Sequence, residues 1–95
     1  MDVGLVGCGR VSEIHMNAYK NIPEANVIAV SDINIDRAKE FAQKYGIKRI
    51  YNDALKLFEI KDLDFVDICT PITTHAKLAC EAAKHGQNAR VFINN

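Results

Sequence analysis

Short apolar runs alternate along this chain with longer stretches in which apolar residues recur every three or four positions. The first run, Val3 to Val6, ends at a glycine, as expected of a strand that is buried on both faces of a parallel sheet. Comparable runs at Val27 to Val30 and Phe65 to Cys69 predict two more strands. Lys48 to Tyr51 is short and charged, which predicts an outer strand, and Arg90 to Ile93 is the candidate for a fifth.

The helical period appears between these runs, starting with two helices that have clear ends. The first is predicted from Arg10 to about Asn21, and Pro23 stops it. Its apolar positions at helical spacing are Val11, Ile14, Ala18 and Ile22. The second is capped by Asn34 and ended by Gly46. The residues that share its apolar face are Ile35, Ala38, Phe41, Ala42 and Tyr45.

Two further helices are predicted in the second half of the chain. Asn52 or Asp53 opens a brief one. Thr73 or Thr74 caps a longer one that Gly86 closes. This longer helix has a face of small residues, formed by Ala76, Ala79, Cys80 and Ala83.

The strict alternation of strands and helices predicts an α/β fold with a Rossmann-like, doubly wound parallel sheet. Right-handed crossovers give the strand order 3-2-1-4-5, with helices on both faces of the sheet in three α/β/α layers. Open sheets of this kind bind ligands where the strand order reverses, at the carboxyl ends of the first and fourth strands. Gly7 to Arg10 and Thr70 to His75 are therefore predicted to meet at one site.

The turn after the first strand reads Gly7-Cys8-Gly9-Arg10-Val11-Ser12 and opens a helix. Gly7 allows the tight turn, and Gly9 lets the backbone approach a pyrophosphate with no Cβ in the way. The phosphates would then lie on the N-terminus of the helix, whose N–H groups and dipole attract anions. Ser12 takes the place of the third glycine, where a small residue permits close packing of the helix on the strand. This context predicts a dinucleotide site.

Asp32 ends the second strand, where a carboxylate accepts hydrogen bonds from both hydroxyls of an adenine ribose and repels a 2′-phosphate. The predicted cofactor is therefore NAD rather than NADP. The alternative is that Asp32 is only a turn residue before the capped helix. Ile33 either covers the adenine or is an exposed loop residue with no such role.

Composition narrows the classes of partner. The chain has 95 residues, 48% of them hydrophobic, and its 12 basic and 12 acidic residues give a formal net charge of zero. These values predict one small domain with one core. The chain has no basic cluster for nucleic acid. Its apolar runs are too short to span a membrane, and no signal-like segment precedes the first strand, so we expect a cytoplasmic protein.

The cysteines and histidines predict little further chemistry. Cys8, Cys69 and Cys80 form no Cys-x-x-Cys pair and are interpreted as reduced, buried thiols, and we predict no metal site. His15, one turn into the first helix, either lines the site or is a partly buried, hydrogen-bonded histidine. His75 is interpreted as a cofactor contact or a support for its loop rather than as a catalytic group.

Together these motifs resemble the glucose-fructose oxidoreductase and inositol dehydrogenase family (Gfo/Idh/MocA). The similarity runs nearly end to end, through Val3-Gly4-Leu5-Val6-Gly7-Cys8-Gly9-Arg10, His15, Ala29-Val30-Ser31-Asp32, Arg37-Ala38, Tyr45-Gly46, Asp64-Phe65-Val66-Asp67-Ile68-Cys69-Thr70-Pro71, His75 and Gly86. The resemblance implies a nicotinamide-dinucleotide domain of an enzyme that passes hydride between the cofactor and a sugar, cyclitol or related polyol.

The resemblance also implies roles for particular residues. The pyrophosphate turn would be formed by Gly7, Cys8, Gly9, Arg10 and Val11. The adenosine would be held by Asp32 and Ile33. The central cleft would be lined by Thr70, Pro71 and His75.

Two departures from the family limit what it implies. Ile72 stands where many members have Asn, so one polar contact to the cofactor's ribose is not supplied. The family's Glu-Lys-Pro, whose lysine assists proton transfer, does not occur, and alignment places Asn94 and Asn95 there. An amide does not act as a general acid or base, so no catalytic residue is predicted.

The expected domain is therefore residues 1–95, a dinucleotide-binding domain that is incomplete at its C-terminus and has no substrate domain. A frameshifted or truncated gene, or a deliberately shortened chain, would each give this ending. The leading hypothesis is a cofactor domain that is not catalytic alone. The alternatives are an NAD-sensing regulatory module and an inactive remnant, which would self-associate through an uncovered sheet edge.

Overall fold

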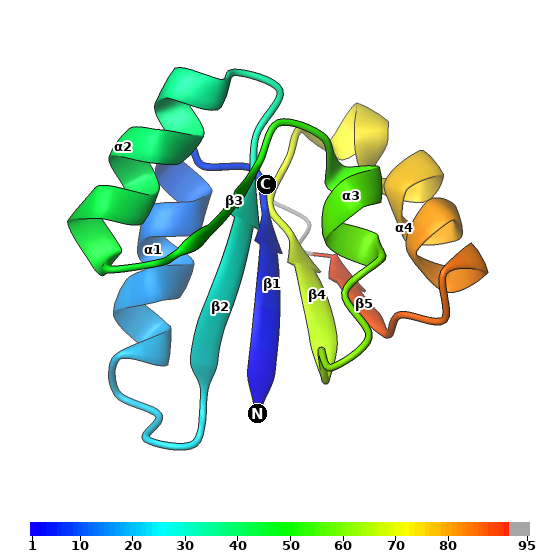
Figure 1. The fold of residues 1–95 in the computed structure, drawn as a ribbon. Helices are drawn as coiled ribbons and strands as arrows, with labels where there is room; N and C mark the ends of the chain where they lie inside the picture. Colours follow the sequence, from blue (N-terminus) through cyan, green and yellow to red (C-terminus); the bar gives the residue numbers. More distant parts are fainter. Residues whose placement is uncertain (92–95) are drawn as a thin grey trace.

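A computed structural model describes residues 1–91 of the chain and contains one parallel sheet of five strands (Figure 1). The strands are β1 (Asp2–Val6), β2 (Asn26–Ser31), β3 (Arg49–Tyr51), β4 (Phe65–Ile68) and β5 (Ala89–Val91). Their order is β3-β2-β1-β4-β5, and every neighbouring pair is parallel. The predicted strand order is confirmed. Residues 92 and 93 of the predicted fifth strand, together with Asn94 and Asn95, lie outside the described residues.

The helices cover both faces of the sheet and so confirm the three-layer arrangement. They are α1 (Arg10–Tyr19), α2 (Ile35–Tyr45), α3 (Ala54–Phe58) and α4 (His75–Lys84), and a 3-10 turn over Ile72–Thr74 precedes α4. Figure 1 shows α1 and α2 on one side of the strands and α3 and α4 on the other. Within residues 1–91, no helix has the length and apolar character needed to cross a membrane.

Each face of the sheet has its own hydrophobic cluster, as side-chain alternation along a strand requires. Beneath α1 and α2 the cluster consists of Leu5, Cys8, Met16, Val30, Ala38, Phe41, Ala42 and Ile47. Beneath α3 and α4 it consists of Val6, Ala29, Leu57, Phe58, Ile60, Val66, Ile68 and Ala82. These two clusters fix β1 in the middle of the sheet, so that the loop after it lies between the loops that follow β2 and β4.

Most predicted helix ends are confirmed by their hydrogen bonds. The Asn34 side chain accepts the N–H groups of Asp36 and Arg37 at 3.1 and 3.3 Å, and Gly46 ends α2 in the left-handed conformation at φ 70°. Asp53, not Asn52, caps α3.

The expected threonine cap of α4 is corrected by the structure. Thr74 is the residue before α4, but its side chain caps no N–H group of the helix. Its hydroxyl donates instead to the carbonyl of Pro71 at 2.7 Å. The 3-10 turn explains the difference, because it brings the Pro71 carbonyl within reach of the hydroxyl.

The buried faces of α1 and α4 differ from the apolar stripes expected for them. Ile14 is 61% exposed and Ala18 is exposed, whereas Ser12 and Met16 are buried. In α4 the buried residues are His75 and Ala82, while Ala76, Cys80 and Ala83 are exposed. In each helix, the face that packs on the sheet carries a polar side chain. Each of these side chains has a hydrogen-bond partner, and a hydrogen-bonded polar group is tolerated in the protein interior.

The burial of the three cysteines follows from the same helix packing. Cys8 is buried and Cys69 is partly buried, but Cys80 is exposed on α4. The expectation that all three thiols are buried is therefore wrong for Cys80, because the face of α4 that contains it points away from the sheet.

Candidate functional site

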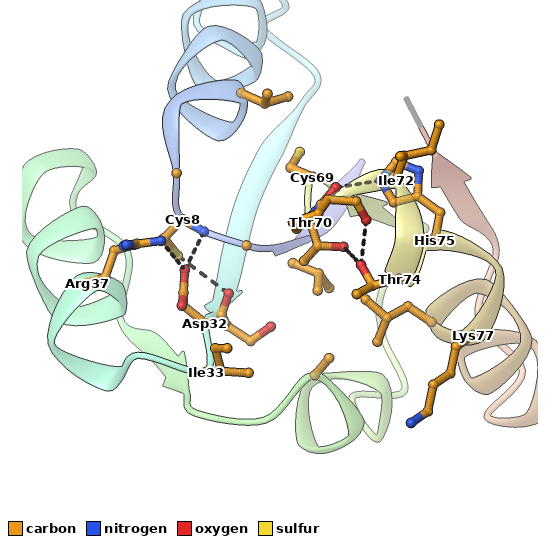
Figure 2. Close-up of a pocket in the computed structure, with 18 of the residues that line it drawn as sticks. Cys8, Asp32, Ile33, Arg37, Cys69, Thr70, Ile72, Thr74, His75 and Lys77 are labelled. Carbon is orange, nitrogen blue, oxygen red and sulfur yellow. Dashed lines mark hydrogen bonds and ion pairs between the residues drawn. The ribbon is translucent and has the colours of Figure 1, made fainter. Parts of the chain in front are cut away.

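A cavity of about 760 Å³ opens at the carboxyl ends of β1, β2 and β4 (Figure 2). This volume is within the range of small-molecule and cofactor sites. Every predicted cofactor-binding residue lines it, namely Gly7, Cys8, Gly9, Arg10, Val11, Asp32, Ile33, Thr70, Pro71 and His75. The fold thus brings together three loops that are far apart in the sequence.

Gly7 and Gly9 have different reasons to be glycine. Gly7 has φ 93°, and a Cβ there would lie 3.2 Å from both the carbonyl carbon of Cys69 and Cγ2 of Thr70. The fold itself therefore needs Gly7. Gly9 has an ordinary φ of −95° and a Cβ there would meet no atom within 4 Å. No neighbour in the described chain requires its small size, and the space beside it is open to a ligand.

The N-terminus of α1 lies at this open space. Gly9 is the residue before the helix, and Arg10 begins it with an exposed side chain. Ser12 is fully buried one turn in, and its hydroxyl donates to the Gly7 carbonyl. Serine therefore satisfies the third-glycine position, because it is small and its one polar group is paired.

Asp32 connects the glycine turn to the end of β2. Its Oδ2 accepts the Cys8 N–H at 2.9 Å, and its Oδ1 accepts the Asn34 N–H at 2.9 Å. The Arg37 guanidinium is 4.0 Å away. Asp32 therefore has a structural role in this turn, and the ribose contact stays a prediction. A carboxylate accepts about four hydrogen bonds, so the two used here leave capacity for the predicted ribose contact.

Ile33 and Cys8 also line the cavity, but Ile33 is exposed and Cys8 is buried. Ile33 is 96% exposed at its rim, where nothing in the described chain covers its side chain. Burial, and then the Asp32 carboxylate, raise the pKa of the Cys8 thiol to about 12. The thiol therefore stays protonated at neutral pH, and Cys8 is not a nucleophile.

The loop after β4 is held by a chain of hydrogen bonds (Figure 2). The Thr74 hydroxyl donates to the Pro71 carbonyl, so the Thr70 hydroxyl, 2.7 Å from it, donates to Thr74. His75 Nε2 donates to the Thr70 carbonyl at 2.6 Å. Its buried Nδ1 has no partner among the described residues. His75 therefore supports the loop, one of the two interpretations made from the sequence.

His15 does not line the cavity. Its Nδ1 lies 2.7 Å from Oδ2 of Asp67, and its side chain is 12% exposed. Of the two interpretations offered for it, the partly buried, hydrogen-bonded histidine is the one the structure shows.

Several cavity residues were not predicted. They are Val6, Ser31, Arg37, Asp53, Ala54, Cys69, Lys77 and Leu78. Ile72 and Thr74 lie within the predicted loop from Thr70 to His75 but were not named as cofactor-binding residues. Asp53 and Ala54 follow β3, so the rule that parallel strands end at one edge of the sheet would have placed them there. Lys77 and Leu78 had no such signal, because their position depends on the 3-10 turn before α4.

Comparison with known proteins then decides the family. The family model described as "Oxidoreductase family, NAD-binding Rossmann fold" (Gfo/Idh/MocA) matches residues 1–94. The chain belongs to the Gfo/Idh/MocA family. The match covers the NAD-binding Rossmann domain of these oxidoreductases, and NAD is the cofactor of that domain.

Two named dehydrogenases are similar to most of this chain. D-apiose dehydrogenase of Paraburkholderia graminis is 38% identical over 82 residues, which are 86% of this chain and 22% of that protein. Myo-inositol 2-dehydrogenase of Thermotoga maritima is 36% identical over 84 residues, 88% of this chain and 25% of that protein. The chain thus spans about a quarter of the length of these relatives.

Solved structures of similar proteins confirm the fold. A probable dehydrogenase from Thermotoga maritima aligns with a TM-score of 0.89 and 32% identity, over 96% of this chain and 27% of that one. An oxidoreductase from Agrobacterium radiobacter, in complex with NAD+, L-tartaric acid and magnesium, aligns with a TM-score of 0.87 and 36% identity, over 94% and 26% of the two chains.

Proposed function

We propose that this chain is the cofactor domain of an NAD-dependent oxidoreductase that acts on a sugar, cyclitol or related polyol, and that it does not catalyse hydride transfer alone. The open space at Gly9 carries the cofactor assignment. A position with ordinary backbone angles and no neighbour within 4 Å of a Cβ has no internal need for glycine. A pyrophosphate that approaches the backbone supplies that need.

In this proposal three loops share the dinucleotide. The turn from Gly7 to Val11 and the N-terminus of α1 hold the pyrophosphate. Asp32 accepts hydrogen bonds from the adenine ribose, and Ile33 covers the adenine. The loop from Thr70 to His75 lines the central cleft. When bound, NAD supplies the hydride acceptor, while these residues bind and orient it.

The substrate class rests on the relatives, which are dehydrogenases of apiose and inositol. The chain spans about a quarter of their length. At the cavity, the Nε2 of His75 is already bonded to a backbone carbonyl and the Cys8 thiol stays protonated. Neither group is poised for proton transfer, so we assign the chain cofactor binding and not the complete reaction.

Titration of the purified 95-residue chain with NADH by calorimetry, with the thermal midpoint recorded alongside, tests the proposal. A ligand that binds the folded state raises the midpoint. We expect saturable NADH binding at one site per chain, with a higher midpoint. A chain that unfolds cooperatively, and is therefore folded, but neither binds NADH nor gains stability from it would overturn the proposal.

Asp32→Ala should weaken NADH binding by about 10- to 100-fold, the value of one hydrogen bond to a charged group. NADPH should lose less, because the same change removes the repulsion of its 2′-phosphate. Both affinities are measured by calorimetry below the thermal midpoint, since the variant also loses the bond to Cys8. Asp36→Ala is the matched control, because Asp36 is exposed in the first turn of α2 outside the cavity. Equal losses for the two cofactors would contradict the ribose assignment.

A further inference from the structure

A buried polar cluster lies between α1 and β4, outside the contacts proposed for the dinucleotide. At its centre is Asp67, whose side chain is 0% exposed. Its Oδ2 is 2.7 Å from Nδ1 of His15 and accepts the Tyr19 hydroxyl at 2.6 Å. Cys69 Sγ is 3.4 Å from its Oδ1 and 3.2 Å from Nδ1 of His15. The cluster therefore contains one nitrogen, one oxygen and one sulfur ligand within a small volume.

The cluster is favourable to a cation. A fully buried carboxylate is costly unless it is paired, and the carboxylate of Asp67 is within hydrogen-bond distance of His15, Tyr19 and Cys69. A carboxylate and a thiolate would together balance the charge of a divalent ion.

We infer that His15, Asp67 and Cys69 form a three-ligand site for a divalent transition metal, with Zn²⁺ the best match. Imidazole, carboxylate and thiolate are all ligands of zinc, and three protein ligands with one open position form a familiar arrangement. The three ligand atoms all lie within 4.8 Å of one another. Zinc bonds of about 2.0 to 2.3 Å at tetrahedral angles place ligands about 3.3 to 3.7 Å apart. Nδ1 of His15 lies 2.7 Å from Oδ2 of Asp67 and 3.2 Å from Sγ of Cys69, and that Sγ lies 3.4 Å from the other carboxylate oxygen, Oδ1. Placing the imidazole, one carboxylate oxygen and the thiolate at the spacing of zinc ligands therefore requires these side chains to move apart.

Metal binding releases one proton and transfers no electron. The metal displaces the proton of the Cys69 thiol, which leaves as H⁺, and the proton of His15 Nδ1 is carried by Nε2 in the ligating tautomer. Tyr19 keeps its hydrogen bond to Asp67 and orients the carboxylate from outside the metal's ligands. His15 and Cys69 are both partly exposed, so a metal has a path from solvent and water takes the fourth position.

The inference does not depend on the proposed function. Gly9 and Asp32 carry the dinucleotide assignment, and neither belongs to the cluster. Cys69 alone lies in both places, since it also lines the cavity. Metal binding and NADH binding are therefore measured on the same samples. If only the metal assignment is wrong, NADH still binds, and if only the dinucleotide assignment is wrong, the metal still binds.

Titration of the reduced 95-residue chain with Co²⁺, followed by absorption spectroscopy, is the test. Thiolate coordination gives a ligand-to-metal charge-transfer band in the ultraviolet, and tetrahedral Co²⁺ gives strong visible bands. We expect both, saturating at one Co²⁺ per chain, and their loss on addition of Zn²⁺. His15→Ala and Cys69→Ser should each weaken binding by at least about tenfold, the loss caused even by removing an outer-shell partner.

His85→Ala and Cys80→Ser are matched controls, because both residues are exposed on or beside α4 and lie outside the cluster. They should bind Co²⁺ as the unchanged chain does. The absence of a thiolate band in the unchanged chain overturns the inference whatever the variants do. Equal losses in the controls also overturn it, because they indicate binding by surface side chains. Circular dichroism of each variant shows that it is folded.

Discussion

Gly9→Val eliminates measurable binding of both NADH and NADPH, an expected loss of more than about 100-fold or about 2.7 kcal/mol. The valine side chain would occupy the open space where the backbone approaches the pyrophosphate, so the loss should not depend on the 2′-phosphate. The protein itself should tolerate the change. Gly9 has an ordinary φ and no atom within 4 Å of a Cβ, and the weaker N-cap costs about 1 kcal/mol. Calorimetry and thermal unfolding separate the two effects.

Two other glycines provide the controls for this result. Gly7→Ala should lower the thermal midpoint, because Gly7 has φ 93° and a Cβ there contacts the Cys69 backbone. Gly86→Ala is also strained, at φ 77°, but lies outside the cavity and should bind NADH with unchanged affinity. NADH binding by Gly9→Val as tight as that of the unchanged chain would remove the main support for the proposed function.

Phe58→Ala should leave much of the chain unfolded at physiological temperature. Phe58 is 1% exposed and is among the largest fully buried side chains among the described residues. Truncation of such a residue costs about 3 to 5 kcal/mol through lost transfer energy and a new cavity. A domain this small has a total stability of about 5 to 10 kcal/mol. Urea unfolding followed by circular dichroism measures the difference.

Leu55→Ala is the matched control for the core, because Leu55 lies in the same short helix but is 38% exposed. It should cost about 1 kcal/mol or less. A similar loss for both variants would mean that the buried contacts of Phe58 contribute no more to stability than those of the partly exposed Leu55. NADH should restore part of the folded population of Phe58→Ala, because binding favours the folded state.

The features that the sequence predicted well are those with a local physical cause. Asn34 and Gly46 mark the ends of α2 through a side-chain cap and a left-handed backbone, which depend on a few neighbouring residues. Apolar runs of strand length and the glycine turn are equally local. Right-handed connections then convert the order of elements along the chain into the order of strands in the sheet. The position of the cavity at the carboxyl ends of the strands could therefore be predicted from the sequence.

The buried faces of the helices were not predictable in this way. Apolar spacing in α1 favoured Ile14 over Ser12, yet Ile14 is exposed and Ser12 is fully buried. Periodicity records which side chains are apolar, whereas packing also buries polar side chains that find partners. Ser12 finds the Gly7 carbonyl, and His75 finds that of Thr70, so both polar groups lie inside at little cost.

The sequence by itself determined the fold class, the strand order and the place of the cavity in the fold, because caps, breaks and hydrophobic periods act within a few residues. The tertiary structure alone decided which polar side chains meet. His15 and Asp67 are 52 positions apart, and their contact exists only because α1 packs beside β4. The proposed metal site depends on that packing, since no spacing along the chain records the distance between side chains on different elements.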